Sequence, residues 1–374
     1  MSASDAGGSG GGDGHGDAAM ATDAGPDQVV DCGAGTCRFG QACVAGACQY
    51  PTCAGVTVPG DYATVQSAVD AIGGLGGTIC IAAGTFPEDV IVQSTKPLVI
   101  QGVSATRTAL DAIHLEQTAD VSIRGISTTK PSDIVLASSQ FVIENSAITC
   151  DTTQSPEGYG LLIQSPAPAT TSSVAIRATK LATVQIAAAL DVRVVTGFTS
   201  ITLDGVELTG TSATGVNVDS KSDAATGDVA MSITNSSFHD CSAGITADTR
   251  NGEHVELTVE NNTITCVELA LYYDNLQALY FNNLFVGSSV AVSAVGPASC
   301  GNNLLYDNAT NYGGTATAGP SYLTANPLLD AASPPGLSAL SPARGAGDPA
   351  HAPAADYWGR PRGPQIDLGA VQSI

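Results

Sequence analysis

SITNSSF at residues 232–238, TVENNTI at 258–264, LYFNNLF at 279–285 and SCGNNLL at 299–305 are four versions of one motif. Each has alternating apolar residues, then a polar pair that is often Asn, then another apolar residue. We call the second residue of each motif its anchor. The pattern recurs earlier in the chain, so that the anchors of the whole repeat are Ile81, Ile100, Ile123, Ile143, Ile176, Leu203, Ile233, Val259, Tyr280 and Cys300. Successive anchors are 19, 23, 20, 33, 27, 30, 26, 21 and 20 residues apart. One rung of a parallel β-helix needs about that much chain, so the repeat predicts a solenoid of about ten rungs.

A second strand recurs after the motif, as GVNVD at 215–219, GITAD at 244–248, LALYYD at 269–274 and SVAVS at 289–293. Two strand registers in every period favour a β-solenoid. A helical solenoid would need a 3.6-residue periodicity over ten or more residues, which the repeat lacks. Only 13% of residues are charged and 5% aromatic, while small and β-branched residues are common. The predicted fold class is therefore all-β.

The segments that flank the repeat predict its two caps. DYATVQSAVDAIGGLGG at residues 61–77 predicts a helix that Asp61 caps and Gly73–Gly74 end. Its apolar face comprises Val65, Ala68, Val69 and Ile72. Such a helix would cover the first rung and prevent edge-to-edge association. Residues 321–374 break the period and hold the only Trp and many Pro, which predicts an irregular C-terminal cap after the β-helix of residues 54–320.

The chain before the repeat divides into two parts. Residues 1–31 are rich in Gly, Ala, Ser and Asp and contain no Lys or Arg, which predicts a disordered linker. Residues 32–53 hold five of the ten cysteines, which predicts a small disulfide-rich module and an oxidising compartment. A zinc site is the rival interpretation. It is disfavoured because C-x4-C-x5-C-x4-C-x4-C has no C-x2-C knuckle and no nearby His.

The spacing of the cysteines also indicates partners. We expect the first four of the module to pair among themselves, namely Cys32, Cys37, Cys43 and Cys48. Cys53 could reach Cys80 at the first rung. Cys241 and Cys266 lie eight and seven residues past their anchors on adjacent rungs, so their Cα atoms could fall within disulfide range.

The charge balance excludes some classes of partner. There are 35 acidic and 13 basic residues, whereas nucleic acid and anionic membranes require clustered Lys and Arg. No apolar run is long enough to span a membrane. No signal peptide is visible at the N-terminus. The cysteines nevertheless favour a secreted or outer cell-surface location.

Two stretches resemble the pectate-lyase-like right-handed parallel β-helix superfamily. ATVQSAVDAIGGLGGTICIAAGTFPEDVIV at 63–92 is similar to the family's opening, with a cap helix, a GGT turn and a strand that ends in AGTF before an acidic residue. SPARGAGD at 341–348, GRPRG at 359–363 and IDLGA at 366–370 resemble the C-terminal cap of exported bacterial β-helix proteins. With the rungs, the resemblance covers residues 56 to about 372 and implies a right-handed coil.

The resemblance does not imply one activity. The family includes pectin esterases, polysaccharide lyases, glycoside hydrolases and adhesins. The motifs QDT, DFIFG and GRPW of the esterases, the hydrolase set NTD, DD, GHG and RIK, and the vWIDH and RxPxxR patterns of the lyases do not occur here. Arg360 in WGRPRG belongs to the closing motif. Fold similarity alone therefore does not make the chain an enzyme.

Three aspartates are the main candidates for chemistry. Asp219, Asp248 and Asp274 occupy one position on three consecutive rungs, which places the outer two roughly 9–10 Å apart. That separation is near the upper end for an inverting acid–base pair. With Lys221 and Arg250 nearby, an Asp-lined groove could hydrolyse glycan, or hold Ca²⁺ for β-elimination. Alternatively, the aspartates end their strands by bonding to the following turns, and the two cations neutralise them.

Other polar residues have mainly structural interpretations. The repeated asparagines are Asn235, Asn261, Asn262, Asn282, Asn283, Asn302 and Asn303. Asn tolerates a left-handed corner, and stacked amides bond to one another, so we expect a ladder rather than a site. Three stretches match N-x-S/T. Trp358 and Tyr357 could pack in the cap or form a sugar platform. His239 and Asp240 form a loop pair.

Together these patterns favour a monomeric, surface-displayed β-helix with a glycan-binding or structural role. The expected partner is extracellular polysaccharide, contacted along one flank of the solenoid. The alternative is a polysaccharide-cleaving enzyme, a glycoside hydrolase or lyase, with the three aspartates as catalytic or Ca²⁺-binding groups.

Overall fold

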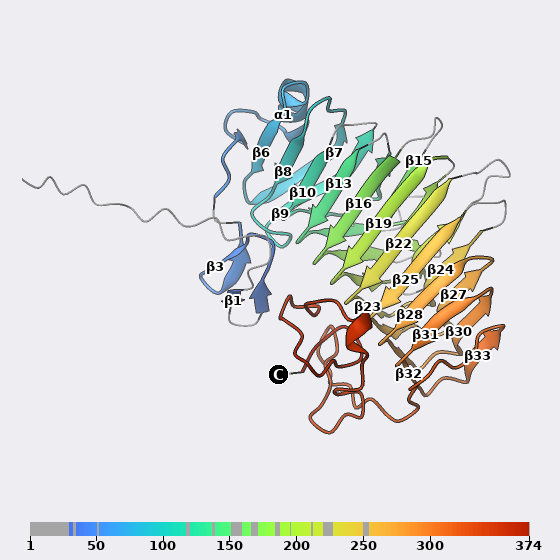
Figure 1. The fold of residues 1–374 in the computed structure, drawn as a ribbon. Coiled ribbons are helices and arrows are strands. Elements are labelled where there is room, and N and C mark those ends of the chain that lie inside the picture. Colours follow the sequence, from blue (N-terminus) through green and yellow to red (C-terminus); the bar gives the residue numbers. More distant parts are fainter. Residues whose placement is uncertain are drawn as a thin grey trace, which may run out of the picture.

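Short parallel strands make up most of the described chain (Figure 1). The structure is a computed structural model, and it describes residues 30–32, 35–50, 52–116, 120–136, 139–150, 159–165, 171–183, 188–194, 196–210, 212–219, 227–249 and 254–373. Most of the predicted linker, residues 1–29, lies outside these ranges. None of the described helices has the length and apolar character needed to cross a membrane.

The first face of the molecule is a sheet of eleven parallel strands. Its members are β5 (Val56–Val58), β6 (Gly77–Ile81), β8 (Leu98–Gln101), β10 (Val121–Arg124), β13 (Gln140–Glu144), β16 (Thr171–Arg177), β19 (Phe198–Asp204), β22 (Asp228–Thr234), β25 (Val255–Glu260), β28 (Gln277–Phe281) and β31 (Ala298–Gly301). From β6 onward, neighbouring strands are not consecutive in the chain, because the chain makes a full coil between them.

The remaining strands of the coils form two further faces. The second face contains β11 (Ser127–Thr128), β14 (Ala147–Cys150), β17 (Lys180–Thr183), β20 (Glu207–Thr209), β23 (Ser237–His239), β26 (Thr263–Thr265), β29 (Leu284–Val286) and β32 (Leu304–Tyr306). The third face contains β12 (Ser132–Val135), β15 (Leu161–Ser165), β18 (Ala188–Val194), β21 (Thr214–Asp219), β24 (Ala243–Asp248), β27 (Leu269–Asp274), β30 (Val290–Val295) and β33 (Thr310–Gly314). Two longer strands, β7 (Gly84–Val92) and β9 (Thr108–Glu116), begin these faces. The predicted all-β class with parallel strands is confirmed, as a parallel β-solenoid.

The anchor residues of the repeat lie in one column of the first face. From Ile100 to Cys300 every successive pair of anchors is in register. The first anchor was predicted wrongly, because Ile79 and not Ile81 pairs with Ile100. The reason is that Cys80 points outward to its disulfide partner, so both neighbouring isoleucines face the interior.

A single apolar core runs through the solenoid. It contains nearly all the inward-facing Val, Ile and Leu side chains of the three faces, from Val58 to Leu305. Alternation of buried and half-buried residues along strands such as β19 and β22 shows the period-two pattern that the sequence displays. The burial of these side chains is the main stabilising contribution to the coil.

The cap helix α1 (Val65–Ile72) covers the beginning of this core. Its buried residues are the four that the sequence assigns to its apolar face. Thr64, and not Asp61, is the N-cap, since its side chain accepts a bond from Ser67 N–H. Asp61 instead accepts bonds from the backbone and hydroxyl of Thr57. The acidic residue of the opening motif is Glu88, whose carboxylate accepts the N–H groups of Val65 and Gln66 at the start of the helix.

The two ends of the described chain pack on the flank of the solenoid (Figure 1). The N-terminal module consists of two antiparallel hairpins, β1 (Val30–Cys32) with β2 (Gly35–Cys37) and β3 (Ala42–Val44) with β4 (Ala47–Gln49). The C-terminal segment is irregular apart from the 3₁₀ turn η2 (Pro349–His351). It buries Leu284 and Leu304 of the second face in a separate apolar cluster with Ala343 and Leu368.

Candidate functional site

The three candidate aspartates share one register position on the third face. Asp219 pairs with Asp248, and Asp248 pairs with Asp274, on the neighbouring strands β21, β24 and β27. We call these residues the Asp column. The side chain of Asp219 lies outside the described part of the structure, as do Lys221 and Arg250. Asp248 and Asp274 are half-buried, and Asp274 accepts a hydrogen bond of 3.3 Å from the hydroxyl of Tyr272.

The Asp column continues toward the N-terminus with an arginine. Val192 pairs with Val218. The next residue, Arg193, therefore has the same register position on β18 that Asp219 has on β21. Arg193 binds Asp191 through Nε at 2.9 Å, and it lies over the ring of Tyr159. A cation therefore belongs to the same column, in addition to the two that the sequence indicates. Alignment of LDVRV with VNVD could have revealed it.

A second polar column lies beside the first on the same face. It includes Asp191, Asn217, Thr246 and Tyr272, which are in register on four successive strands. Asn217 donates to Asp191 at 2.9 Å, and Thr246 donates to Asn217 at 2.8 Å. Asp191 is only 3% exposed although it stands on the outward side. This network fixes the side chains in place from coil to coil.

The same face carries a histidine–carboxylate pair nearer the cap. His114 on β9 is hydrogen-bonded through Nδ1 to Asp133 on β12, and Gln164 on β15 approaches the other oxygen of Asp133 at 3.4 Å. The bond to Asp133 raises the pKa of His114 above its usual value, against the effect of burial. This pair could not be predicted from the sequence pattern, because its members come from different rungs.

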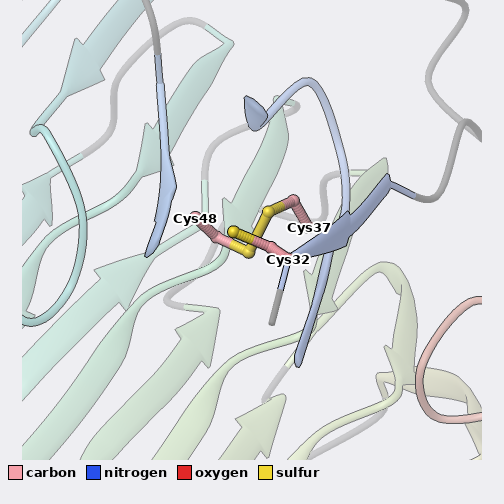
Figure 2. A group of neighbouring side chains, drawn as sticks. All are labelled: Cys32, Cys37 and Cys48. Carbon is pink, nitrogen blue, oxygen red and sulfur yellow. A yellow bond between two sulfur atoms is a disulfide. The ribbon is translucent and has the colours of Figure 1, made fainter. Parts of the chain in front are cut away.

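The cysteines form four disulfides among the described residues. They are Cys32–Cys43, Cys37–Cys48, Cys53–Cys80 and Cys241–Cys266. Figure 2 shows the side chains of Cys32, Cys37 and Cys48 gathered in the module, and one ligand atom from each lies within 4.8 Å of the others. Their thiolates are consumed by the disulfides, so the zinc interpretation does not apply to this oxidised form.

The asparagines stand at the corner between the first and second faces, which we call the Asn corner. One residue per coil adopts positive φ there, namely Gly125, Asn145, Ala178, Gly205, Asn235, Asn261, Asn282 and Asn302. The residues that follow form the expected ladder. Asn262 donates to Asn283 at 3.2 Å, and Asn283 donates to Asn303 at 3.0 Å. The amides of the sequon residues Asn235, Asn261 and Asn308 all donate hydrogen bonds within the protein.

The module and the C-terminal segment meet at the Asn corner. Arg38 of the module donates to the carbonyl of Tyr357 and lies 3.9 Å from the carboxylate of Asp204. The amide of Asn145 donates to the carbonyl of Arg38 at 3.0 Å and to the hydroxyl of Tyr50 at 2.9 Å. Desolvation lowers the pKa of Arg38 below its usual value, although Asp204 opposes this effect. The sequence did not predict this junction, which joins segments about 320 residues apart.

The aromatic pair of the closing motif takes part in packing. The rings of Tyr357 and Trp358 meet edge to face at 4.8 Å, and both residues are half-buried. Next to them Arg360 forms an ion pair with the fully buried Asp356 at 2.6 Å. Burial raises the pKa of Tyr357 above its usual value. These contacts favour the packing role that the sequence left open.

His239 belongs to a larger cluster than the sequence indicates. Its Nε2 lies 3.0 Å from Glu207, and its Nδ1 lies 2.9 Å from Asp240. Lys180 donates to the same Glu207 at 2.9 Å. The hydrogen bond from His239 and the charge of Lys180 lower the pKa of Glu207 to about 2, while Glu207 raises the pKa of His239. The cluster neutralises a half-buried carboxylate on the second face.

No protein-family model matches the chain, and no curated protein matches it.

Proposed function

We propose that this chain is a secreted or cell-surface member of the pectate-lyase-like β-helix superfamily that binds extracellular polysaccharide along its third face. The parallel solenoid and the four disulfides fit an extracellular protein. The opening and closing motifs support the family, the resemblance implies a right-handed coil, and the repeat in the sequence predicts about ten rungs.

The observation that carries the proposal is the pair of polar columns on the third face. The Asp column and the column of Asp191, Asn217, Thr246 and Tyr272 run side by side on the outward side of the third face, since their members lie two residues apart on the same strands. Successive coils are about 4.8 Å apart. A glycan that lies along the solenoid axis would therefore meet a carboxylate, an amide or a hydroxyl on the coils of β21, β24 and β27, where these groups are half-buried. Asp191, which is only 3% exposed, would hold the amide of Asn217 in place. Half-buried, mutually bonded groups of this kind bind sugar hydroxyls at a low entropic cost.

The other parts of the chain are proposed to display this face. Residues 1–31 serve as a disordered tether and residues 32–53 as a disulfide-rich module. Residues 54–320 form the β-helix with α1 as its N-terminal cap, and residues 321–374 form the C-terminal cap. The protein acts as a monomer in this proposal, and its acidic charge disfavours nucleic acid as a partner.

The second candidate function is cleavage of the bound glycan. It is favoured by the shared register of Asp219, Asp248 and Asp274. Two of the carboxylates would act as general acid and base, or the three would hold Ca²⁺, with Lys221 and Arg250 as compensating charges. The absence of the family's catalytic motifs from the sequence makes this the alternative rather than the main proposal.

The experiment is a screen of the full chain against neutral, acidic and amino-sugar polysaccharides, with Ca²⁺ and with a chelator. Retention on an affinity gel and the length of the recovered glycan are both measured. We expect retention without shortening of at least one polysaccharide. Shortened chains would establish the enzyme instead, and no retention of any polymer would leave a purely structural surface role.

A further inference from the structure

The disulfide Cys53–Cys80 encloses the whole N-terminal cap in a covalent loop. The two cysteines are 27 residues apart in sequence, and their Cα atoms are 5.7 Å apart. Strand β5 and helix α1 lie entirely within this loop. Any tension on the chain before Cys53 can therefore pass directly to Cys80 through the sulfur atoms, without crossing the cap.

The enclosed cap is the part of the solenoid that is easiest to remove. Strand β5 has three residues and stands at the edge of the first face, where it pairs with β6 alone. Helix α1 has eight residues and is held by its apolar side, by Glu88 and by the bonds between Gln66 and Ile91. In a solenoid each element contacts only its neighbours, so tension on one end detaches the elements in sequence.

Strand β6, at which the disulfide enters the solenoid, is better supported. It pairs with β5 on one side and with β8 on the other. The next element along the chain is β7, whose nine residues pair with β9 over seven positions. Tension that arrives at Cys80 must therefore disrupt an interior strand and a long ladder at once, instead of a three-residue edge strand.

We propose that Cys53–Cys80 protects the cap from tension on the N-terminal tether, so that the solenoid stays folded while it is held to a surface. The inference rests on the proposed display of the protein on that tether. The module is protected in the same way, because the disulfide Cys32–Cys43 lets tension pass from Cys32 to Cys43 without following the chain between them. In this proposal the hydrogen bonds of Arg38 and Tyr50 at the Asn corner break first, and the disulfide then carries the tension.

The test is a force-clamp measurement on the full oxidised chain, held by its two ends at a force that leaves the solenoid folded. A small thiol in the buffer attacks a loaded disulfide, forms a mixed disulfide with one sulfur and releases the other as a thiolate. Cleavage of Cys53–Cys80 should then extend the molecule by about 90 Å, since its 27 residues contribute about 3.5 Å each. The same molecule without thiol should show no such step.

Two double variants assign the step. C53A/C80A should lack it and should release the cap at low force without any thiol. C241A/C266A removes a disulfide of similar loop length, 25 residues, which lies within the folded solenoid and does not carry the tension. This variant should retain the step, because Cys53–Cys80 is still present. Absence of the thiol-dependent step in the wild type, or its persistence in C53A/C80A, would overturn the inference. A protein that retains no glycan but gives the step would refute the proposed ligand and leave the protective role intact.

Discussion

The Asn corner and the third face both carry columns of polar side chains stacked at the strand spacing, yet they differ in burial. At the corner Asn262 and Asn283 are fully buried, and the C-terminal segment bonds to Asn261 and Asn282 from outside. On the third face the residues of the Asp column that are described remain half-buried. Residues that recur at one position of successive coils thus stack on one another, whatever their chemical type. What other segments pack over the column decides whether it supports the fold or remains available to a ligand.

The largest change in the free energy of unfolding should come from a substitution at the buried Asn corner. Asn283→Leu removes the amide bonds to Val259 O and Asn303 and the acceptor for Asn262 N–H. Each buried group left without a partner costs about 1–3 kcal/mol, so we expect the free energy of unfolding to fall by about 3 kcal/mol or more. Urea denaturation measures the change.

Asn326→Ala is the matched control for this change. Asn326 is exposed and bonds only locally, to Leu328 N–H at 2.8 Å. Its loss should cost about 1 kcal/mol or less. Equal losses of stability in the two variants would show that burial does not distinguish the corner from the surface.

The junction at the corner should give the next largest effect. Arg38→Ala leaves the carbonyl of Tyr357 and the carboxylate of Asp204 without their buried partner. We expect a loss of about 2–3 kcal/mol, with faster amide hydrogen exchange in residues 344–373. Arg107→Ala is the control, because the exposed Arg107 also contacts the module, at Gln49. Unchanged exchange in the Arg38 variant would show that the module does not hold the C-terminal segment.

The cluster on the second face should produce an intermediate, pH-dependent effect. Because the pKa of Glu207 is lowered to about 2, its stabilising contribution is complete above the usual value of 4.5 and is lost as the pH falls toward 2. The pKa of His239 is raised, so the dependence on pH is the reverse: the stabilising contribution of protonated His239 is complete at low pH and is lost as the pH rises through the raised pKa of His239. Glu207→Gln should reduce the fall in unfolding free energy between pH 5 and pH 2 by about 2 kcal/mol. Identical acid titrations of the variant and the wild type would contradict the assignment.

The smallest change in stability should come from the third face. Conversion of the Asp column to Asn, as D219N/D248N/D274N, preserves size and removes three charges, of which those of Asp248 and Asp274 lie at half-buried positions. We expect the free energy of unfolding to change by about 1 kcal/mol or less, while retention on the polysaccharide found in the screen is lost. The control D228N/E256Q removes exposed charges from the first face and should keep retention. If both variants retain the glycan, the Asp column is not the binding surface.

Much of the fold could be predicted because the repeat is strict where the core requires it. The anchors from Ile100 onward, the apolar face of α1 and the asparagine ladder all follow from patterns within one coil. The prediction was wrong at Ile81 and Asp61, where a disulfide and a local bond to Thr57 override the local pattern. Asp191 and the pair of His114 and Asp133 were missed, since Asn217 and Asp133, which bond to Asp191 and His114, come from neighbouring coils. Arg193 was missed because LDVRV was not aligned with VNVD.

By itself, the sequence determined the period of the coil, which residues face its interior and where the chain must turn with positive φ. These properties depend on alternation and on single-residue conformational preferences, both of which are local. The tertiary structure alone decided that the module and the C-terminal segment meet at Arg38, and that the Asn corner is closed while the third face is half-buried. Such contacts join residues hundreds of positions apart, and no local preference encodes which distant surfaces will pack together.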